Sequence, residues 1–389
     1  MRLAILTIFL LTLAISGCGD RMALPSVQRS DNDFGANDTT YIRIGQDWTA
    51  PSIGYNAPNP MEPVDIVIGE DNYLFVADLA NDRIITLTQN GQVARDLNLD
   101  KIHPVAHPLA IDIDAKLNLL IVNGSNTIYV WNQYVNMYGM LSAAVDTNDQ
   151  GDPDFITDKT LIDSLKSVHP FYVDDDPTAS FQGIAFAPLE DNAVYVTDSQ
   201  NNRIIRLNLV VTAAARMTSG HVALPMFSGI FAEEIASYGS GAGTVDNPRS
   251  ITCDQSGNIY FTQLGGNFLV QKLKKQGSSF IPGYTLYEDP IMDLNRFMGP
   301  NDIALGQDDA IFVVDTPDSG RVSKFVNKGT RAGKSTNLGK TGLALARFNR
   351  PMGIAVSDDE MVYIANSAEH RIERFQYSIS DSDIPIEPQ

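Results

Sequence analysis

Near its C-terminus the chain reads PMGIAV at 351–356, then VYIAN at 362–366, then HRI at 370–372. The same succession of short apolar words occurs five more times along the chain. The six copies span 63–84, 108–130, 181–205, 248–263, 300–322 and 351–375. Internal repeats with a period of about 40 to 50 residues are typical of propellers and solenoids, because a single repeat cannot bury its own apolar face. Each copy is rich in β-branched and aromatic residues between Gly, Asn, Asp and Ser, which predicts short β-strands.

These words resemble the NHL repeat family over roughly residues 41–377. Proteins of that family form β-propellers, commonly six-bladed, so the resemblance implies an all-β, six-bladed β-propeller. A fourth strand per blade is expected from segments such as 236–239, just before the next repeat word. The sixth copy has no such segment after Phe375. We expect residues 41–45 to supply it, so that the N-terminal strand closes the last blade and leaves no open sheet edge there.

The N-terminal segment has the features of a targeting sequence. Residues 1–17 combine a positive start at Arg2 with an apolar run that is too short to be a membrane span. Small residues followed directly by Cys18 resemble the bacterial lipobox, which implies cleavage before Cys18 and its lipidation. Residues 18–40 then predict a lipidated flexible tether, and 378–389 a disordered acidic tail. The implied location is the bacterial cell envelope, and Gly19 favours the outer membrane in a Gram-negative host.

The net charge restricts the partners of the chain. The formal charge is −19, and it becomes −20 when Arg2 is removed with the signal peptide. A strongly acidic protein is a poor match for the phosphates of nucleic acid or for anionic lipid, so membrane contact is expected through the lipid anchor alone. Once Cys18 is lipidated, Cys253 is the only other cysteine. The chain can therefore form no internal disulfide, and Cys253 is expected to be a small buried side chain.

The repeat alignment also identifies residues at one end of the central channel. In a propeller the first strand of each blade lines the channel, and the loop before it opens at the channel mouth. The mouth positions that carry polar side chains are Asp65, His107, Arg249, Ser250, Asn301 and Asp302. Asp65 and Asp302 replace the glycine of the family pattern, and only blade six separates their blades. These residues predict a polar, partly acidic mouth for a small ligand or cation; the alternative is that they cap strand starts and bind water.

A second set of polar residues recurs too regularly to form a site. An Asp ends the second strand of three copies, and an Arg follows it a few residues later. The members of this set are Asp78, Asp198, Asp315, Arg83, Arg203, Arg321 and Arg371. We expect the carboxylates to accept turn amides and the arginines to bridge to them, as structural features of the repeat.

The longest insertion, about 132–179, contains an acidic run that is compatible with calcium. Asp146, Asn148, Asp152 and Asp154 place oxygen atoms at alternate positions, with Gly151 sixth, which resembles a calcium loop. Gln150 at the fifth position and Thr157 in place of a bidentate Glu depart from that pattern. A solvated acidic loop is the alternative reading.

The sequence leaves two classes of function open. The first is a lipid-anchored binding or scaffold module for a protein, peptide or glycan. The second is a metal-dependent lyase or hydrolase at the channel mouth, because the peptide-amidating lyases resemble this repeat family and hold a central zinc through histidines. His107 is the only histidine at the mouth positions, and Pro104 and Pro108 exclude a helix that would bring His103 beside it. No Ser-His-Asp or Cys-His set can be assigned, so the binding module is the preferred reading.

Overall fold

The computed structural model describes most of the repeat region. The described residues are 40–56, 58–94, 106–132, 143–147, 153–156, 168–188, 191–213, 216–218, 221–223, 226–283, 290–316, 320–326, 328–329, 331–338 and 348–378. The predicted signal segment, Cys18, nearly all of the tether and all but the first residue of the tail lie outside them. Within the described residues, no helix has the length and apolar character needed to cross a membrane.

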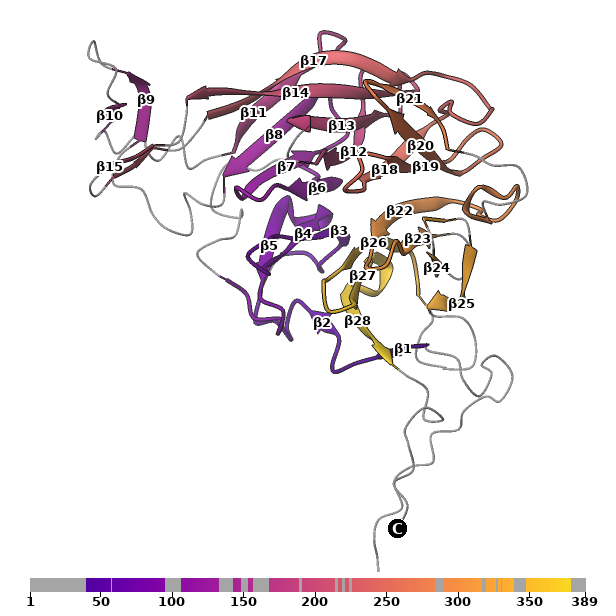
Figure 1. Ribbon diagram of the computed structural model, residues 1–389. Helices are drawn as coiled ribbons and strands as arrows, with labels where there is room; N and C mark the ends of the chain where they lie inside the picture. The colour runs from indigo at the N-terminus through magenta and orange to yellow at the C-terminus, as the bar shows by residue number, and fades with distance from the viewer. Residues whose placement is uncertain are drawn as a thin grey trace, which may run out of the picture.

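The repeats form six small antiparallel sheets arranged in a ring, which confirms the predicted six-bladed β-propeller (Figure 1). Blade 1 contains β3 (Pro63–Ile68), β4 (Leu74–Asp78) and β5 (Arg83–Leu87). Blade 2 contains β6 (Ala110–Ile113), β7 (Asn118–Val122), β8 (Thr127–Asn132) and β11 (His169–Val173). Blade 3 contains β12 (Phe181–Phe186), β13 (Ala193–Asp198), β14 (Arg203–Ala213) and β17 (Met226–Ala236).

The second half of the chain supplies the other three blades. Blade 4 contains β18 (Pro248–Cys253), β19 (Ile259–Gln263), β20 (Val270–Gln276) and β21 (Ser279–Pro282). Blade 5 contains β22 (Pro300–Leu305), β23 (Ile311–Asp315), β24 (Arg321–Val326) and β25 (Arg331–Leu338). Blade 6 contains β26 (Pro351–Val356), β27 (Met361–Asn366) and β28 (Arg371–Ser378). Short 3-10 turns lie at η1 (Leu79–Asn81), η5 (Pro290–Met292) and η6 (Ser367–Glu369).

The N-terminal strand closes the ring in blade 6, as the sequence predicted. β1 (Thr40–Arg43) pairs antiparallel with β28, from Thr40 opposite Ser378 to Arg43 opposite Phe375. The two-residue strand β2 (Trp48–Thr49) pairs with the start of the same β28. Chain segments from both ends of the propeller therefore share one sheet, and the outer edge of β28 is covered.

The hydrophobic core lies between the blades rather than within them. One cluster joins Val130 and Phe171 of blade 2 to Phe181 and Val196 of blade 3. Another joins Phe312 of blade 5 to residues of blade 6 and to β1. Each blade is a single sheet with two apolar faces, so it is stable only when a neighbour covers each face.

The recurring Asp and Arg residues have the structural role that the sequence predicted. Arg83, Arg203 and Arg321 donate through Nε to Asp78, Asp198 and Asp315 at 2.7, 3.0 and 2.9 Å. The other oxygen of each carboxylate accepts the backbone N–H of the residue before the inner strand, for example Glu62 to Asp78 at 2.8 Å. In blade 6 Asn366 takes the place of the Asp, and Arg371 donates to Glu373 instead.

Blade 3 carries a feature that the repeat pattern did not predict. β14 and β17 pair along their length, and β14 contacts β9 (Ala143–Thr147) (Figure 1). β9 in turn contacts β16 (His221–Ala223), which pairs with β15 (Arg216–Thr218). The expectation that 236–239 forms the fourth strand of this blade is wrong, because β17 ends at Ala236. Tyr238 instead bridges to Val245 in the connection to blade 4.

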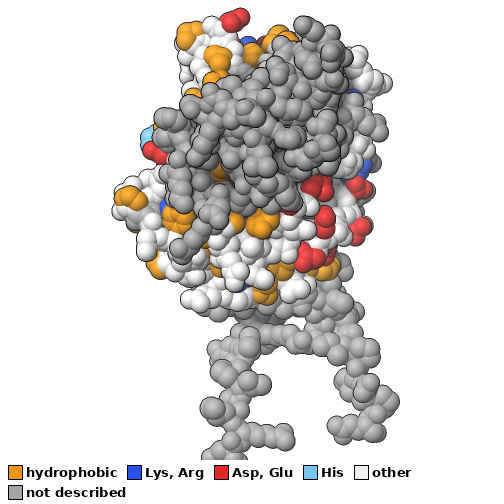
Figure 2. Space-filling view, turned by 90° about the vertical axis from the view of Figure 1, so that its left-hand side faces the viewer, with side chains coloured by type: hydrophobic (Ala, Val, Ile, Leu, Met, Phe, Trp, Pro, Cys, Tyr) orange, Lys and Arg blue, Asp and Glu red, His pale blue; other side chains and the backbone are white. Residues whose placement is uncertain are grey.

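The outer surface reflects the acidic composition. Figure 2 shows acidic side chains gathered along one side of the visible face, with few Lys or Arg among them. Many arginines of the described residues are already bound to carboxylates, as at Arg43–Asp47, Arg206–Glu233 and Arg350–Glu62. An arginine without such a partner is therefore unusual among the described residues.

Candidate ligand-binding site at the channel mouth

The six inner strands β3, β6, β12, β18, β22 and β26 form the inner ring of the propeller. Each contacts the next around the ring, and β26 contacts β3 to complete it. Equivalent residues meet across the junctions, such as Ser250 with Asp302, so the inner strands run in the same direction. Their first residues therefore lie together at one end of the channel, which is where the sequence placed the mouth.

Two of the predicted mouth residues bridge neighbouring inner strands. Asp65 accepts the N–H of Ile66 in its own strand through Oδ1 and that of Ile111 in blade 2 through Oδ2, at 2.8 and 2.7 Å. Asp302 does the same for Ile303 and for Ile354 in blade 6, at 2.8 and 2.7 Å. We call each of these carboxylates a latch. Asp65 and Asp302 are 9% and 8% exposed, so both are buried between the blades rather than open to solvent.

Sequence comparison missed a third latch. Asp112 accepts N–H groups from Ile113 in its own strand and from Phe186 in blade 3, at 2.9 and 2.7 Å. Asp112 lies two residues further along its inner strand than Asp65 does. Asp112 pairs with Leu120 of β7, whereas Asp65 pairs with Ala77 of β4. Because the strand period is two, Asp112 keeps the same facing and repeats the geometry one step deeper.

The other junctions use small side chains and hydroxyls. A Cβ at Gly353 would lie 2.6 Å from Asp65 Cα, and one at Gly183 would lie 2.3 Å from the Arg249 carbonyl oxygen. Glycine therefore permits close approach of the strands where no latch is present. Thr197 donates to the Arg249 carbonyl at 2.6 Å, and Ser250 donates to Asp302 Oδ1 at 2.5 Å.

Burial shifts the acidity of all three latches in the same direction. It raises the pKa of Asp65 well above its ordinary value, and the charge of Asp302 adds to that effect. Burial also raises the pKa of Asp302 to about 6 and that of Asp112 to about 7, although their amide donors act in the opposite sense. The latches thus titrate closer to neutral pH than exposed carboxylates do. A direct contact of Asp65 or Asp302 with a ligand or cation stays a prediction.

In each inner strand, the residue directly before the position of Asp65 and Asp302 is either polar or apolar, and these six residues form two arcs. The polar arc is Gln182, Arg249 and Asn301 of blades 3, 4 and 5. The apolar arc is Met352, Val64 and Leu109 of blades 6, 1 and 2. Arg249 donates from Nη1 to Gln182 Oε1 at 2.7 Å, and Asn301 donates from Nδ2 to the Met352 carbonyl at 2.6 Å. Gln182, Arg249 and Asn301 are half-buried, whereas Val64 is buried in the core between blades 1 and 2, against which Met352 also packs.

His107 lies at the rim of the mouth and is 72% exposed in its side chain. Its backbone N–H donates to Asp82 Oδ1 at 2.7 Å, and its Nδ1 lies 3.2 Å from the same oxygen. His370 bonds through Nδ1 to the Met61 carbonyl at 2.9 Å, so it joins blades 6 and 1. The described residues contain no group of three or more His, Cys, Asp or Glu arranged to hold a metal. Their arrangement does not fit the zinc site that the lyase resemblance implies.

The calcium prediction falls on a hairpin that the structure describes in part. β9 pairs with β10 (Pro153–Ile156), and Asp146 lies opposite Asp154 across the pair. Asn148 and Asp152, the other two predicted ligands, lie outside the described residues. Calcium binding at this loop stays a prediction. Cys253, by contrast, is half-buried, and burial raises the pKa of its thiol to about 12, as suits an unreactive side chain.

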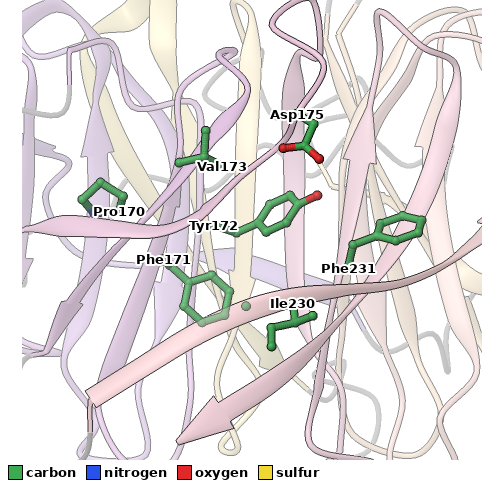
Figure 3. Close-up of a pocket in the computed structure, with 8 residues that line it drawn as sticks. Pro170, Phe171, Tyr172, Val173, Asp175, Ile230 and Phe231 are labelled. Atoms are coloured by element: carbon green, nitrogen blue, oxygen red, sulfur yellow. The ribbon is translucent and has the colours of Figure 1, made fainter. Parts of the chain in front are cut away.

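A concave surface lies on the outside of the ring. A pocket of about 340 Å³ opens between β11 of blade 2 and β17 of blade 3, with Phe171, Tyr172, Ile230 and Phe231 at its walls (Figure 3). Ile230 and Phe231 are 54% and 46% exposed, so they present apolar surface to solvent. The sequence reading did not find this pocket, because β17 extends the blade over a segment that does not match the repeat.

Comparison with known proteins supports the fold more than an activity. No family model matches the chain. The chain is 25% identical over 144 residues to the probable peptidyl-alpha-hydroxyglycine alpha-amidating lyase pgal-1 of Caenorhabditis elegans, a match that covers 37% of this chain and 41% of that protein. It is 20% identical over 255 residues to human teneurin-4, covering 59% of this chain and 9% of that protein. The chain thus spans less than half the length of either relative.

Solved structures likewise support the fold rather than an activity. A putative phosphatase from Bacteroides thetaiotaomicron aligns with a TM-score of 0.53 at 12% identity, over 88% of this chain and 79% of that one. A streptogramin B lyase aligns with a TM-score of 0.48 at 16% identity, over 86% and 97%. At such identities the likeness shows the propeller fold alone.

Proposed function

We propose that this chain is a lipid-anchored propeller of the bacterial cell envelope that binds a protein, peptide or glycan at the mouth of its channel. The proposal rests on the hydrogen bonds that the polar side chains of the mouth make. The three latch carboxylates each accept two backbone N–H groups, one from their own inner strand and one from the next blade, and so hold the ring together. Arg249 and Asn301, next to the latch positions, are half-buried, so part of their polar surface reaches solvent.

The anchoring part of this proposal predicts a specific fractionation result. Replacing Cys18 by Ala removes the only proposed anchor, and an acidic domain has no electrostatic attraction to anionic lipid. Each buried acyl CH₂ contributes about 0.8 kcal/mol to membrane binding, so loss of the chains should release the protein. We expect the Cys18→Ala variant in the soluble fraction and the wild type in the membrane fraction after a salt wash. A variant that still sediments with washed membranes would contradict lipid anchoring.

The alternative is a metal-dependent lyase or hydrolase, and the partial match to the amidating lyase is what favours it. Zinc analysis of the purified chain separates the two functions. We expect no stoichiometric zinc that depends on His107, because its Nδ1 already lies beside Asp82 and no second histidine of the described residues joins it. Stoichiometric zinc that is lost in the His107→Ala variant, together with turnover that zinc restores, would replace the binding proposal with the enzyme.

A further inference from the structure

The outer strand of blade 3 has a backbone edge that no described residue covers. β17 pairs with β14 on one side and, within the described residues, with no strand on the other. The pairing is regular from Phe227 opposite Val211 to Phe231 opposite Leu207. Half of the N–H and C=O groups of an antiparallel edge strand point away from its partner. In this part of the structure, residues 227–231 make no backbone hydrogen bond besides those to β14, so their outward groups are free to pair with another strand.

The outer strands of the other blades are covered or carry residues that discourage strand pairing. The chain that follows β5 folds back on that strand in blade 1. β1 of blade 6 has four residues. β11 and β21 contain Pro170 and Pro282, and β25 contains Lys334. Proteins use short edges, prolines and lysines in this way to prevent unwanted pairing, whereas residues 227–231 contain no Pro, Lys or Arg.

Apolar side chains lie on both faces of blade 3 beside this edge. A Cβ at Gly229 would lie 2.6 Å from the Phe171 ring, so Gly229 faces blade 2. Because side chains alternate along a strand, Phe231 shares that direction and Ile230 points the other way, as Figure 3 shows. Val173 of β11, which lines the same pocket, is 53% exposed. Exposed apolar side chains that gather in this way mark a surface for interaction.

We propose that the outer edge of β17 binds an extended, basic and apolar segment of a partner protein as an added β-strand. Backbone hydrogen bonds to residues 227–231 supply the affinity, and alternate side chains cover Phe231 on one face and Ile230 on the other. A helix or a compact apolar ligand would cover one face and leave the backbone edge unpaired. The site lies on the outside of the ring, so this inference does not rest on ligand binding at the channel mouth.

The charge of the protein favours a basic partner over a second copy of this chain. Asp175 lines the pocket, Glu234 follows in β17, and both residues are exposed. The formal net charge is −19, so two copies of the chain repel each other while a segment with Lys or Arg is attracted. The partner segment is therefore one in which basic residues flank an alternating apolar run.

The test uses the full-length protein in detergent and a short peptide of alternating Val and Thr with a Lys at each end. Wild type should bind this peptide, and hydrogen exchange at 227–231 should slow about tenfold when the peptide is present at about ten times its Kd. The same peptide with N-methylated central amides keeps its side chains but cannot pair, so it should bind about tenfold or more weakly. Glu in place of both Lys residues should also weaken binding, less so at high salt.

Two substitutions on the exposed faces of β17 separate this site from the rest of the surface. Phe231→Ser removes apolar area that the added strand would cover, so binding should weaken about tenfold. Ile230→Lys places a charge beside the edge and should also weaken binding. The matched control is Ile281→Lys in β21, because Ile281 is 40% exposed on the outer strand of blade 4. It should leave binding of the peptide unchanged.

Three results would overturn the proposal. The first is equal binding of the peptide and its N-methylated form, which would show that apolar contact rather than strand pairing holds the peptide. The second is no binding of the peptide, or binding that leaves exchange at 227–231 unchanged. The third is slow exchange at 227–231 in the free protein that becomes faster on dilution, which would assign the edge to a second copy of the chain.

Discussion

Deletion of residues 40–46 should lower the melting temperature of the whole propeller by roughly 5 °C or more, rather than loosen one end. The deletion removes β1, whose Tyr41 is 6% exposed and packs 5.7 Å from the Phe312 ring and 5.2 Å from the Tyr377 ring. Loss of one buried aromatic side chain costs about 3–5 kcal/mol, which corresponds to a shift of that size in a domain this large. Because neighbouring blades share their hydrophobic cores, the loss should destabilise the other blades as well.

Tyr41 also holds a buried charge, which adds to the effect. Lys324 Nζ of blade 5 donates to the Tyr41 hydroxyl at 2.9 Å and lies within 5.5 Å of the centres of three aromatic rings. Lys324 is 9% exposed, and burial lowers its pKa. Without β1 this ammonium loses both its acceptor and one of its rings. The N-terminal strand therefore binds blade 5 to blade 6 as well as completing the sheet.

Thermal melts of three variants test this closure. Deletion of 19–39, which removes only the predicted tether, is the control and should leave the melting temperature unchanged. Tyr41→Phe should cost about 1–3 kcal/mol, because it leaves Lys324 without its acceptor. Adding Lys324→Met to Tyr41→Phe should recover part of that loss, which a double-mutant cycle measures. Equal melting of the wild type and the 40–46 deletion would show that β2 alone suffices to close blade 6.

The sequence predicted the ring and its closure because both depend on repeated apolar words. A strand that faces two neighbouring blades must be apolar on both sides. That requirement produces the same run of apolar residues in each of the six copies. The Asp78–Arg83 pair and its equivalents were predictable for the same reason, since the corner they stabilise recurs. Features that occur only once, such as the extension of β14 and β17, produce no repeated sequence pattern and could not be predicted in this way.

The site was harder to predict because its chemistry depends on partners rather than on residue types. Comparison of the copies placed Asp65 and Asp302 at the mouth, but residue identity does not reveal that each carboxylate accepts an amide of the neighbouring blade. Asp112 was missed because it lies in a different column of the alignment. Arg249 was found as a polar residue, whereas its hydrogen bond to the neutral Gln182 of the neighbouring blade is a property of the fold.

Removal of one latch should have a large effect on stability. Asp302→Ala leaves the Ile303 and Ile354 N–H groups and the Ser250 hydroxyl without their acceptor, between blades that exclude water. An unsatisfied buried donor costs about 1–3 kcal/mol, so three of them should cost roughly 3 kcal/mol or more. Asp302→Asn retains one acceptor oxygen and should lie between Asp302→Ala and the wild type. Ser250→Ala is the matched control, because it removes one donor and leaves the latch between blades 5 and 6 intact.

The latches also give the stability of the protein a defined pH dependence. The folded-state pKa values of Asp302 and Asp112 are raised to about 6 and about 7, so the folded protein binds more protons than the unfolded chain between about pH 4 and pH 7. Stability contributed by these groups is therefore present below pH 4 and is lost as the pH rises through 6 to 7. Denaturant titrations of wild type and Asp302→Asn across this range measure the contribution. The free energy of unfolding should fall more steeply with pH in the wild type, because the variant has no proton to lose at this position. Parallel slopes would mean that folding does not raise the pKa of Asp302. An Asp302→Ala variant as stable as the wild type would mean that the Asp302 latch does not hold blades 5 and 6 together.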